Sequence, residues 1–256
     1  METNRITIVG AGNVATHLGC ALADAGAEIV QVCARSTASA HALADRLGAQ
    51  AIDNPADVDP TVDFCIICAT DTAIPEIAGR LPHIGGIAVH TSGSVPMDAL
   101  LPAAAMVGVL YPLQTFSKGR ALDVRCVPFF TEGSDADTLA AIDALASAVS
   151  DSVHHADSST RPLLHVAGVL GCNFPNYLLG CAAEVLARGG YSLEVLRPLL
   201  QETVAKAFEF GPDNAQTGPA IRGDRSTIDR HSAMLPHVQA SIYETISQAI
   251  MDKYRI

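Results

Sequence analysis

Apolar residues in the first part of the chain form short continuous runs that alternate with segments of helical spacing. The runs at residues 5–9, 28–34 and 62–69 have the length of strands, and the nearly continuous apolar run at 62–69 is typical of a strand buried on both faces of a sheet. Residues 37–47 show helical spacing and stop before Gly48, a residue type that often follows a helix. Alternating strands and helices favour parallel strands joined by crossover helices.

This pattern continues to residue 155 and then changes. Further strands are expected at residues 87–90, 105–110, 126–131 and 153–155, with a helix at 135–149. Beyond about residue 157 strand signals stop, and helices are expected over roughly residues 160–188 and 193–210, with a last one opened by Pro236. We therefore predict an α/β fold: a doubly wound, mostly parallel sheet in residues 1–156 and a smaller all-α domain in residues 157–256.

The helix expected over residues 160–188 contains an uncharged stretch, residues 163–183, that is long enough to span a bilayer. Polar residues such as His165 and Asn173 interrupt it, so a buried helix in the domain core is expected instead. Pro175 lies in its interior, where it removes a backbone donor and should bend the helix.

The turn after the first strand has the glycine spacing of a dinucleotide-binding, Rossmann-like fold. Gly10 permits a tight bend, Gly12 lets the backbone approach a pyrophosphate, and the following helix points unpaired N–H groups at the phosphates. Gly10, Gly12, Asn13 and Val14 are therefore predicted to hold the pyrophosphate. The alternative is a glycine-rich turn with no ligand.

The end of the second strand indicates which dinucleotide is bound. Proteins that prefer NAD place an acidic residue there to bind the ribose 2′-hydroxyl, whereas this chain has Arg35 followed by Ser36. A guanidinium can form a forked contact with a 2′-phosphate, so NADP is the predicted cofactor. The alternative is that Arg35 is a solvated charge and Ser36 only an N-cap.

Composition narrows the classes of partner. The 256 residues carry a formal net charge of −11, which gives no electrostatic support for binding nucleic acid or anionic membranes. Seven cysteines and a start without an export segment favour a reducing, cytoplasmic location. Cys65 and Cys68 should point to opposite faces of their strand as core residues, and no metal site is expected. A small helical domain of this kind often forms a dimer surface, so a homodimer through it is predicted.

Ligands of doubly wound sheets bind beyond the carboxyl ends of the strands, so the loops that follow the strands are the candidate sites. Ala69, Thr70 and Asp71 are expected near the nicotinamide half of the cofactor. His90 and Ser92 lie in a hydroxyl-rich loop after the next strand, with His90 assigned to the cofactor and Ser92 to the substrate. The alternative for such residues is capping and turn chemistry.

The long helix supplies a second candidate set. His165 lies on a stripe of helical spacing in an otherwise apolar segment, and Asn173 flanks it. An imidazole and a carboxamide facing the cofactor could donate a proton and anchor a substrate oxygen. The alternative is that both are hydrogen-bonded packing groups between domains.

These motifs together resemble known families. The glycine turn with Ala34-Arg-Ser36 resembles the superfamily of pyrroline-5-carboxylate reductase and 6-phosphogluconate dehydrogenase. The closer resemblance is to a group that joins a Rossmann-like domain to a C-terminal domain of unknown function and is labelled as NADP oxidoreductases, sometimes as deazaflavin-dependent. It rests on His90-Thr-Ser-Gly-Ser94, Tyr111-Pro-Leu-Gln-Thr-Phe116, His165-Val-Ala-Gly, Asn173-Phe174 and Thr217-Gly-Pro-Ala-Ile-Arg-Gly-Asp224. The acid/base lysine of the sugar-acid dehydrogenases is absent, and His165 lies near its position.

The predicted function is an NADP-dependent oxidoreductase that transfers a hydride between the nicotinamide and a small carbonyl or imine substrate. His165 is the predicted proton donor, and Ser92 and Asn173 are the predicted substrate contacts. The alternative is a protein of the same fold that binds NADP(H) without catalysis, as a sensor or as a regulator of a partner.

Overall fold

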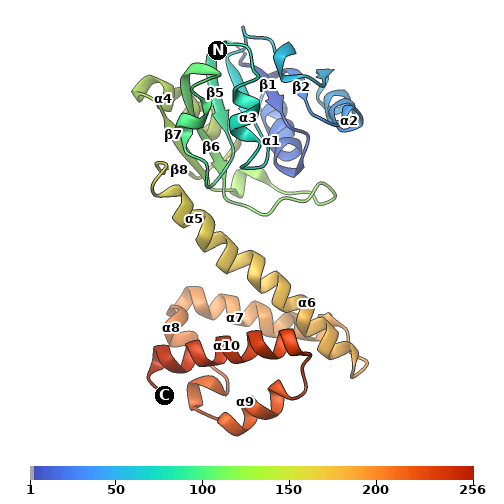
Figure 1. The fold of residues 1–256 in the computed structure, drawn as a ribbon, viewed down its shortest axis with the longest axis vertical. Helices are drawn as coiled ribbons and strands as arrows, with labels where there is room; N and C mark the ends of the chain where they lie inside the picture. Colours follow the sequence, from blue (N-terminus) through green and yellow to red (C-terminus); the bar gives the residue numbers. More distant parts are fainter. Residues whose placement is uncertain (1–2) are drawn as a thin grey trace. The chain divides into compact units, whose positions relative to one another are not determined.

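The computed structural model describes residues 3–256, and the chain divides after Cys172 into two compact units (Figure 1). The first unit holds every strand of this described part and the second is helical. The predicted α/β fold with a helical C-terminal region is therefore confirmed.

The first unit is built on one eight-stranded sheet with the order β3-β2-β1-β4-β5-β6-β7-β8. Its strands are β1 (Arg5–Val9), β2 (Glu28–Cys33), β3 (Gln50–Ile52), β4 (Phe64–Ile67), β5 (Ile84–His90), β6 (Ala104–Pro112), β7 (Phe129–Gly133) and β8 (Val153–His155). All neighbours pair in parallel except β6 and β7. The chain winds from β1 toward β3 and then from β4 outward, so the switch point lies between β1 and β4.

Two apolar layers cover the faces of this sheet. The helices that alternate with the strands are α1 (Asn13–Asp24), α2 (Thr37–Leu47), α3 (Ile74–Ala78) and α4 (Ala136–Val149). Ile66 and Ile67 are adjacent and fully buried, yet they belong to different apolar clusters, as expected of a central strand covered on both faces. Cys65 and Cys68 likewise pack into opposite clusters, and burial raises the pKa of both thiols to about 12. The prediction that they are core residues is confirmed for Cys65, which is fully buried, whereas Cys68 is half-buried and packs against its cluster.

The sheet contains one strand that the sequence did not predict and one antiparallel pair, which the prediction of a mostly parallel sheet allows. The three-residue edge strand β3 was not expected, because so short a segment carries little periodic signal. β7 runs antiparallel to β6, because the chain between them contains only a short 3-10 turn, Val124–Cys126, and no crossover helix.

The boundary between the units lies within the predicted long helix. Strands end with β8, as the sequence pattern indicated, but α5 (Arg161–Gly168) still belongs to the first unit. Arg161 in its first turn is fully buried and bonded to Glu132, which ties α5 to the sheet. A π-helical turn, Val169–Asn173, then leads into α6 (Phe174–Ala187), and Pro175 lies in the first turn of α6, where its missing N–H is tolerated.

The expectation that this helix is buried in a domain core is wrong for the single chain. Residues Arg161–Ala187 form a helical stretch long and apolar enough to cross a membrane by length and composition, and its most apolar window is not buried. Leu163, Val166, Leu170 and Phe174 are each more than half exposed. The chain by itself leaves this apolar surface uncovered.

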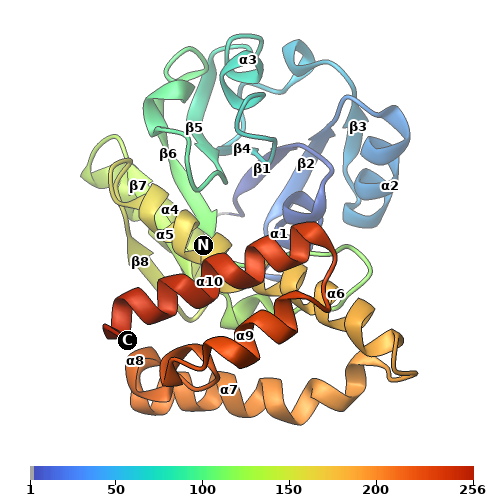
Figure 2. The same ribbon diagram turned by 60° about the horizontal axis from the view of Figure 1, so that its bottom comes forward.

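The second unit consists of α6, α7 (Arg197–Phe210), α8 (Pro212–Ala215), α9 (Arg225–Ser232) and α10 (His237–Tyr254) (Figure 2). The last of these begins directly after Pro236, as predicted. The buried core of the second unit is small and consists of Ala220, Ile228 and Met251. So small a core leaves most apolar side chains of the unit near the surface.

Candidate functional site

The glycine turn after β1 has the geometry that a dinucleotide requires. Gly10 has a φ of +129°, and a Cβ there would lie 2.1 Å from the Cys68 carbonyl oxygen, so only glycine fits. Gly12 caps the start of α1 without a side-chain hydrogen bond, and a Cβ there would meet nothing within 4 Å. The backbone at Gly12 can therefore be approached closely, and the N–H groups of the first turn of α1 follow it directly, which suits a pyrophosphate.

Asn13 and Val14 stand in this first turn, where their backbone N–H groups are available. The side chain of Asn13 donates to the Phe116 carbonyl at 2.8 Å, so its amide group is used within the protein. Nearby, the ammonium group of Lys118 donates to the Ala11 carbonyl at 2.6 Å. The segment after β6 thus brings a cation to the glycine turn, and sequence reasoning missed it because the contact spans more than a hundred residues.

Arg35 and Ser36 follow β2, at the position expected to meet the adenosine ribose. Arg35 is exposed and makes no ion pair or hydrogen bond with any residue from 3 to 256. The Ser36 hydroxyl accepts from the Ser39 N–H at 3.3 Å and so caps α2, as the alternative reading proposed. Both side chains remain at the surface and open to a ligand.

The loop after β4 carries an exposed carboxylate. Ala69 is half-buried, Thr70 and Asp71 are exposed, and the Thr70 carbonyl accepts from the Ala73 N–H in the turn that leads to α3. Asp71 Oδ1 accepts a hydrogen bond from the Ser92 hydroxyl at 2.7 Å. The loops after β4 and β5 are therefore joined at the carboxyl edge of the sheet.

Ser92 itself has no hydrogen-bonding capacity left for a ligand. Its hydroxyl donates to Asp71 and accepts from the N–H groups of Ser94 and Val95, at 3.0 and 3.1 Å. Only 6% of the residue is exposed. In this structure Ser92 shapes its loop and orients Asp71, rather than facing a substrate as the sequence suggested.

His90, the last residue of β5, has no exposed surface. Its Nδ1 accepts from the Ser92 N–H at 3.2 Å, which places the proton of the neutral ring on Nε2. Burial, and secondarily the charge of Arg161, lower the pKa of His90 to about 4. His90 is therefore a neutral, buried support of the loop that was predicted to contact the cofactor.

Tyr111 and His165 form a contact at the same edge. Tyr111, near the end of β6, is 8% exposed, and its hydroxyl lies 3.2 Å from Nδ1 of the exposed His165 on α5. Burial first, and then the charge of Asp71, raise the pKa of Tyr111. A Cβ at Gly93 would lie 2.8 Å from the Tyr111 ring and 2.9 Å from His165 Nδ1, so Gly93 permits the close approach.

A buried arginine fixes the loop that follows β5. Arg161 Nη1 lies 2.5 Å from Glu132 Oε2, its Nε donates to the Ser92 carbonyl at 3.1 Å, and its Nη2 donates to the Val95 carbonyl. Glu132 also accepts from the N–H and hydroxyl of Ser158. The sequence prediction missed Arg161, whose one signal is a charged residue in the first turn of an apolar helix.

The remaining predicted residue, Asn173, is exposed and begins the second unit. His165 belongs to the first unit. Within residues 3–256, no group of three or more His, Cys, Asp or Glu side chains is arranged to hold a metal ion.

Comparison with known proteins matches the two parts of the chain to two family models. Residues 2–115 match a Rossmann-like domain, and residues 127–250 match a domain of unknown function, DUF2520. No curated protein matches the chain.

Solved structures match the whole chain. A Bacteroides fragilis protein provisionally named as an NADP oxidoreductase is 38% identical, with 98% of each chain covered and a TM-score of 0.92. A Thermotoga maritima protein is 19% identical, with 98% of this chain and 100% of that chain covered and a TM-score of 0.79. A reductive aminase from Aspergillus terreus, in complex with NADPH and ethyl levulinate, is 16% identical, with 99% and 94% covered and a TM-score of 0.76. The Thermotoga maritima and Aspergillus terreus proteins show that this chain shares their fold.

Proposed function

Since this chain belongs to the same family as the Bacteroides fragilis protein, we propose that it is an NADP-dependent oxidoreductase that transfers a hydride between the nicotinamide and a small carbonyl or imine compound. The observation that carries the proposal is the open start of α1 at Gly12, with unpaired backbone donors. Arg35, exposed and without a partner in residues 3–256, stands at the end of the next strand.

The residues present fit this cofactor along its length. Gly10 and Gly12 give access to the backbone, the N–H groups of Asn13 and Val14 would hold the pyrophosphate, and Lys118 adds a positive charge. Arg35 and Ser36 would hold the 2′-phosphate, because a planar guanidinium binds phosphate in a forked geometry. Ala69, Thr70 and Asp71 would hold the nicotinamide ribose, and His90 would support that end from within the loop.

The cofactor, when bound, supplies the hydride, and the protein orients the substrate and provides the proton. We assign the proton source to His165, which is exposed on α5 beside the strand ends. Ser92 acts indirectly by orienting Asp71. Asn173 is the proposed anchor for a substrate oxygen or nitrogen.

The test is a comparison of NADPH and NADH binding by calorimetry. Arg35→Glu is expected to weaken NADPH binding at least about 10-fold, because it removes a charge-assisted contact and adds a repulsive charge, while NADH binding stays the same. Arg230→Glu, the same change at an exposed arginine of α9, is the control and should alter neither affinity. Equal affinities of the unaltered protein for both nucleotides would refute the assignment of NADP.

Turnover is tested separately, as NADPH oxidation with oxo acids, cyclic imines and oxidised deazaflavin. Reduction of at least one class is expected. Tight NADPH binding without turnover would support the alternative, a nucleotide-binding sensor, and recovery of a partner protein in only one redox state of the cofactor would strengthen it.

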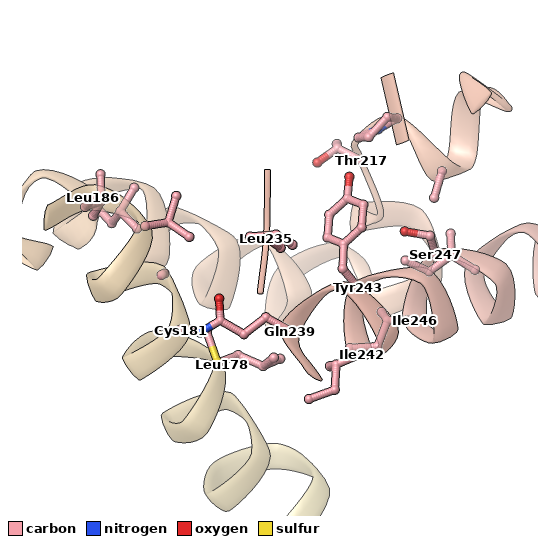
Figure 3. A pocket seen from close by; sticks show the side chains of 16 residues that line it. Leu178, Cys181, Leu186, Thr217, Leu235, Gln239, Ile242, Tyr243, Ile246 and Ser247 are labelled. Carbon is pink, nitrogen blue, oxygen red and sulfur yellow. The ribbon is translucent and has the colours of Figure 1, made fainter. Parts of the chain in front are cut away.

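We also propose that the protein is a homodimer formed through its helical region. Among residues 3–256, all large apolar side chains that are exposed, except Leu101 and Met106, lie beyond residue 160. The second unit contains an apolar groove of about 500 Å³, with side chains of α6 and α10 around it (Figure 3). Leu178 and Ile246 line this groove and are themselves exposed. A second copy presents both the apolar helix surface and the groove, so it is the occupant that fits.

The composition of the chain bears on its ligands and its location. The net charge of −11 favours small molecules over nucleic acid as ligands. All seven cysteines are unpaired, which suits a reducing cytoplasm.

A further inference from the structure

Tyr111 has no role in the function proposed above, although it is the side chain that His165 contacts. We infer that Tyr111 is the group that gives the proton to the substrate and that His165 resupplies it, so that the two residues form one proton-transfer pair. This inference rests on the proposed reduction of a carbonyl or imine. It assigns a catalytic role to the first residue of the Tyr111–Phe116 motif, for which the sequence analysis proposed no role.

The geometry of the pair is defined by three elements. Tyr111 Oη and His165 Nδ1 are 3.2 Å apart, and the rings meet edge to face with an interplanar angle of 62°. Gly93, in the loop after β5, packs against the pair, and a Cβ added to it would lie 2.8 Å from the Tyr111 ring carbon Cζ. The loop that carries Gly93 is itself held by Arg161, through the carbonyls of Ser92 and Val95. The positions of Tyr111 and His165 are therefore set by β6, α5 and the loop after β5.

The order of transfer follows from exposure. Tyr111 is buried near the end of β6, at the carboxyl edge where ligands of doubly wound sheets bind. His165 is exposed on α5 and can exchange protons with water. A proton can therefore pass from solvent to His165, from His165 to Tyr111 and from Tyr111 to the ligand.

The surrounding charges explain why the tyrosine needs the histidine. Burial and the carboxylate of Asp71 raise the pKa of Tyr111, and the opposing charge of Arg161 is paired with Glu132. His90, which Asp71 and Arg161 also influence, has a pKa of about 4 and is neutral near pH 7. The phenol is therefore protonated but is a weak acid alone, whereas an imidazolium beside it can replace the proton as it leaves.

The proton and electron count balances. As the hydride of the reduced nicotinamide forms a bond to the substrate carbon, the C=O or C=N π pair takes the proton of the Tyr111 hydroxyl. The Nδ1–H of protonated His165 passes its proton to the Tyr111 oxygen. Tyr111 ends as a neutral phenol, His165 ends neutral, and the nicotinamide gains the positive charge. Water then reprotonates His165.

The first test needs no substrate and uses NMR of the full-length protein. With ¹⁵N-labelled histidine, neutral His165 is expected to carry its proton mainly on Nε2, because Nδ1 accepts from Tyr111. Tyr111→Phe should remove that preference. The ¹³Cζ signal of Tyr111 should also differ between the wild type and His165→Gln. An unchanged tautomer in Tyr111→Phe, or a Tyr111 signal that is the same in His165→Gln, would overturn the inference.

The second test is kinetic and uses the turnover assay with NADPH. Tyr111→Phe, which keeps the ring beside Gly93, is expected to lower kcat about 100-fold or more with NADPH affinity unchanged. His165→Gln should lower kcat and change the dependence of the rate on pH relative to the wild type. Tyr191→Phe, at an exposed tyrosine in the turn after α6, is the control.

The outcomes separate the two proposals. Full activity of Tyr111→Phe, or an unchanged pH profile in His165→Gln, would overturn the proton-transfer pair and leave the oxidoreductase intact. Failure of NADPH to bind, or binding without any turnover, counts against the oxidoreductase, and the NMR result then decides whether the pair is coupled.

Discussion

His90 illustrates what a single residue does at the centre of this site. Its ring is completely buried and accepts one hydrogen bond from the N–H of Ser92. Because a neutral ring is stable there and a charged ring is not, the folded protein holds His90 unprotonated to about pH 4, whereas an unfolded chain would protonate it near pH 6.5. The site is therefore built around a histidine that is not the acid.

This depressed pKa predicts sensitivity to acid. Between pH 6.5 and pH 4 the unfolded state binds a proton that the folded state does not, so the free energy of unfolding falls as the pH is lowered through this range. Protonation of His90 in the unfolded state should lower the free energy of unfolding by about 3 kcal/mol at pH 4, from the conversion of a pKa shift into energy. His90→Asn, which retains an acceptor for Ser92, should lack this contribution.

Urea unfolding at pH 7, 5.5 and 4 measures the effect as the difference between wild type and variant. His41→Asn, at an exposed histidine of α2, is the control and should keep the wild-type pH dependence. Parallel pH curves for wild type and His90→Asn would contradict the prediction.

At the scale of elements, the loop after β5 is positioned from outside by α5 and β7. Arg161 reaches from the first turn of α5 to two carbonyls of this loop, and Glu132 on β7 balances its charge. Ser158 links the same carboxylate to the N–H of Met97. The loop therefore has its shape because three elements meet there, and its own sequence is insufficient to hold it.

Removal of one partner of this buried pair should destabilise the protein more than removal of both. Arg161→Met leaves Glu132 with an uncompensated charge, and a loss of about 3–5 kcal/mol is expected. The double variant Arg161→Met with Glu132→Met should lose less than the sum of the single variants, since the uncompensated charge disappears.

Denaturant unfolding of the single and double variants tests this coupling. The exposed pair of Glu194 and Arg197 gives the matched control, for which the same cycle should show far weaker coupling because solvent screens the two charges. Additive losses at Arg161 and Glu132 would show that the pair does not act as a unit.

At the scale of the whole molecule, the uncovered apolar surface of the helical region is the dominant feature. Leu170 and Phe174 are more than half exposed within Arg161–Ala187, and Phe208 on α7 is 89% exposed. Soluble monomers rarely leave so many large apolar side chains uncovered. The helix length would also permit a membrane span, so the proposal of a homodimer needs a direct test.

Light scattering after gel filtration, without detergent, should give twice the 26.6 kDa mass of one chain. Leu170→Asp combined with Phe174→Asp is expected to give a monomer or aggregates, because charges in an apolar interface are costly. Leu101→Asp, at an exposed apolar residue of the first unit, should remain dimeric. A monomeric wild type, or its flotation with lipid vesicles, would contradict the dimer and favour a membrane.

The sequence alone determined those features that depend on neighbouring residues. The bounds of α2 and β8 match the prediction, and continuous apolar runs marked the central strands, because periodicity and capping are local properties. The glycine turn was evident for the same reason, since the φ of Gly10 and the open position of Gly12 serve a local bend.

Tertiary structure decided everything that joins distant segments. Tyr111 and His165 are 54 residues apart, and Arg161 and Glu132 are 29 apart, so sheet order and the return of α5 bring them together. The use of the Ser92 hydroxyl by Asp71 and two backbone groups could not be inferred from a serine in a loop. The helix over residues 161–187 shows the same limit at larger scale: its apolar pattern predicts burial, but what buries it depends on surfaces that a local pattern does not encode.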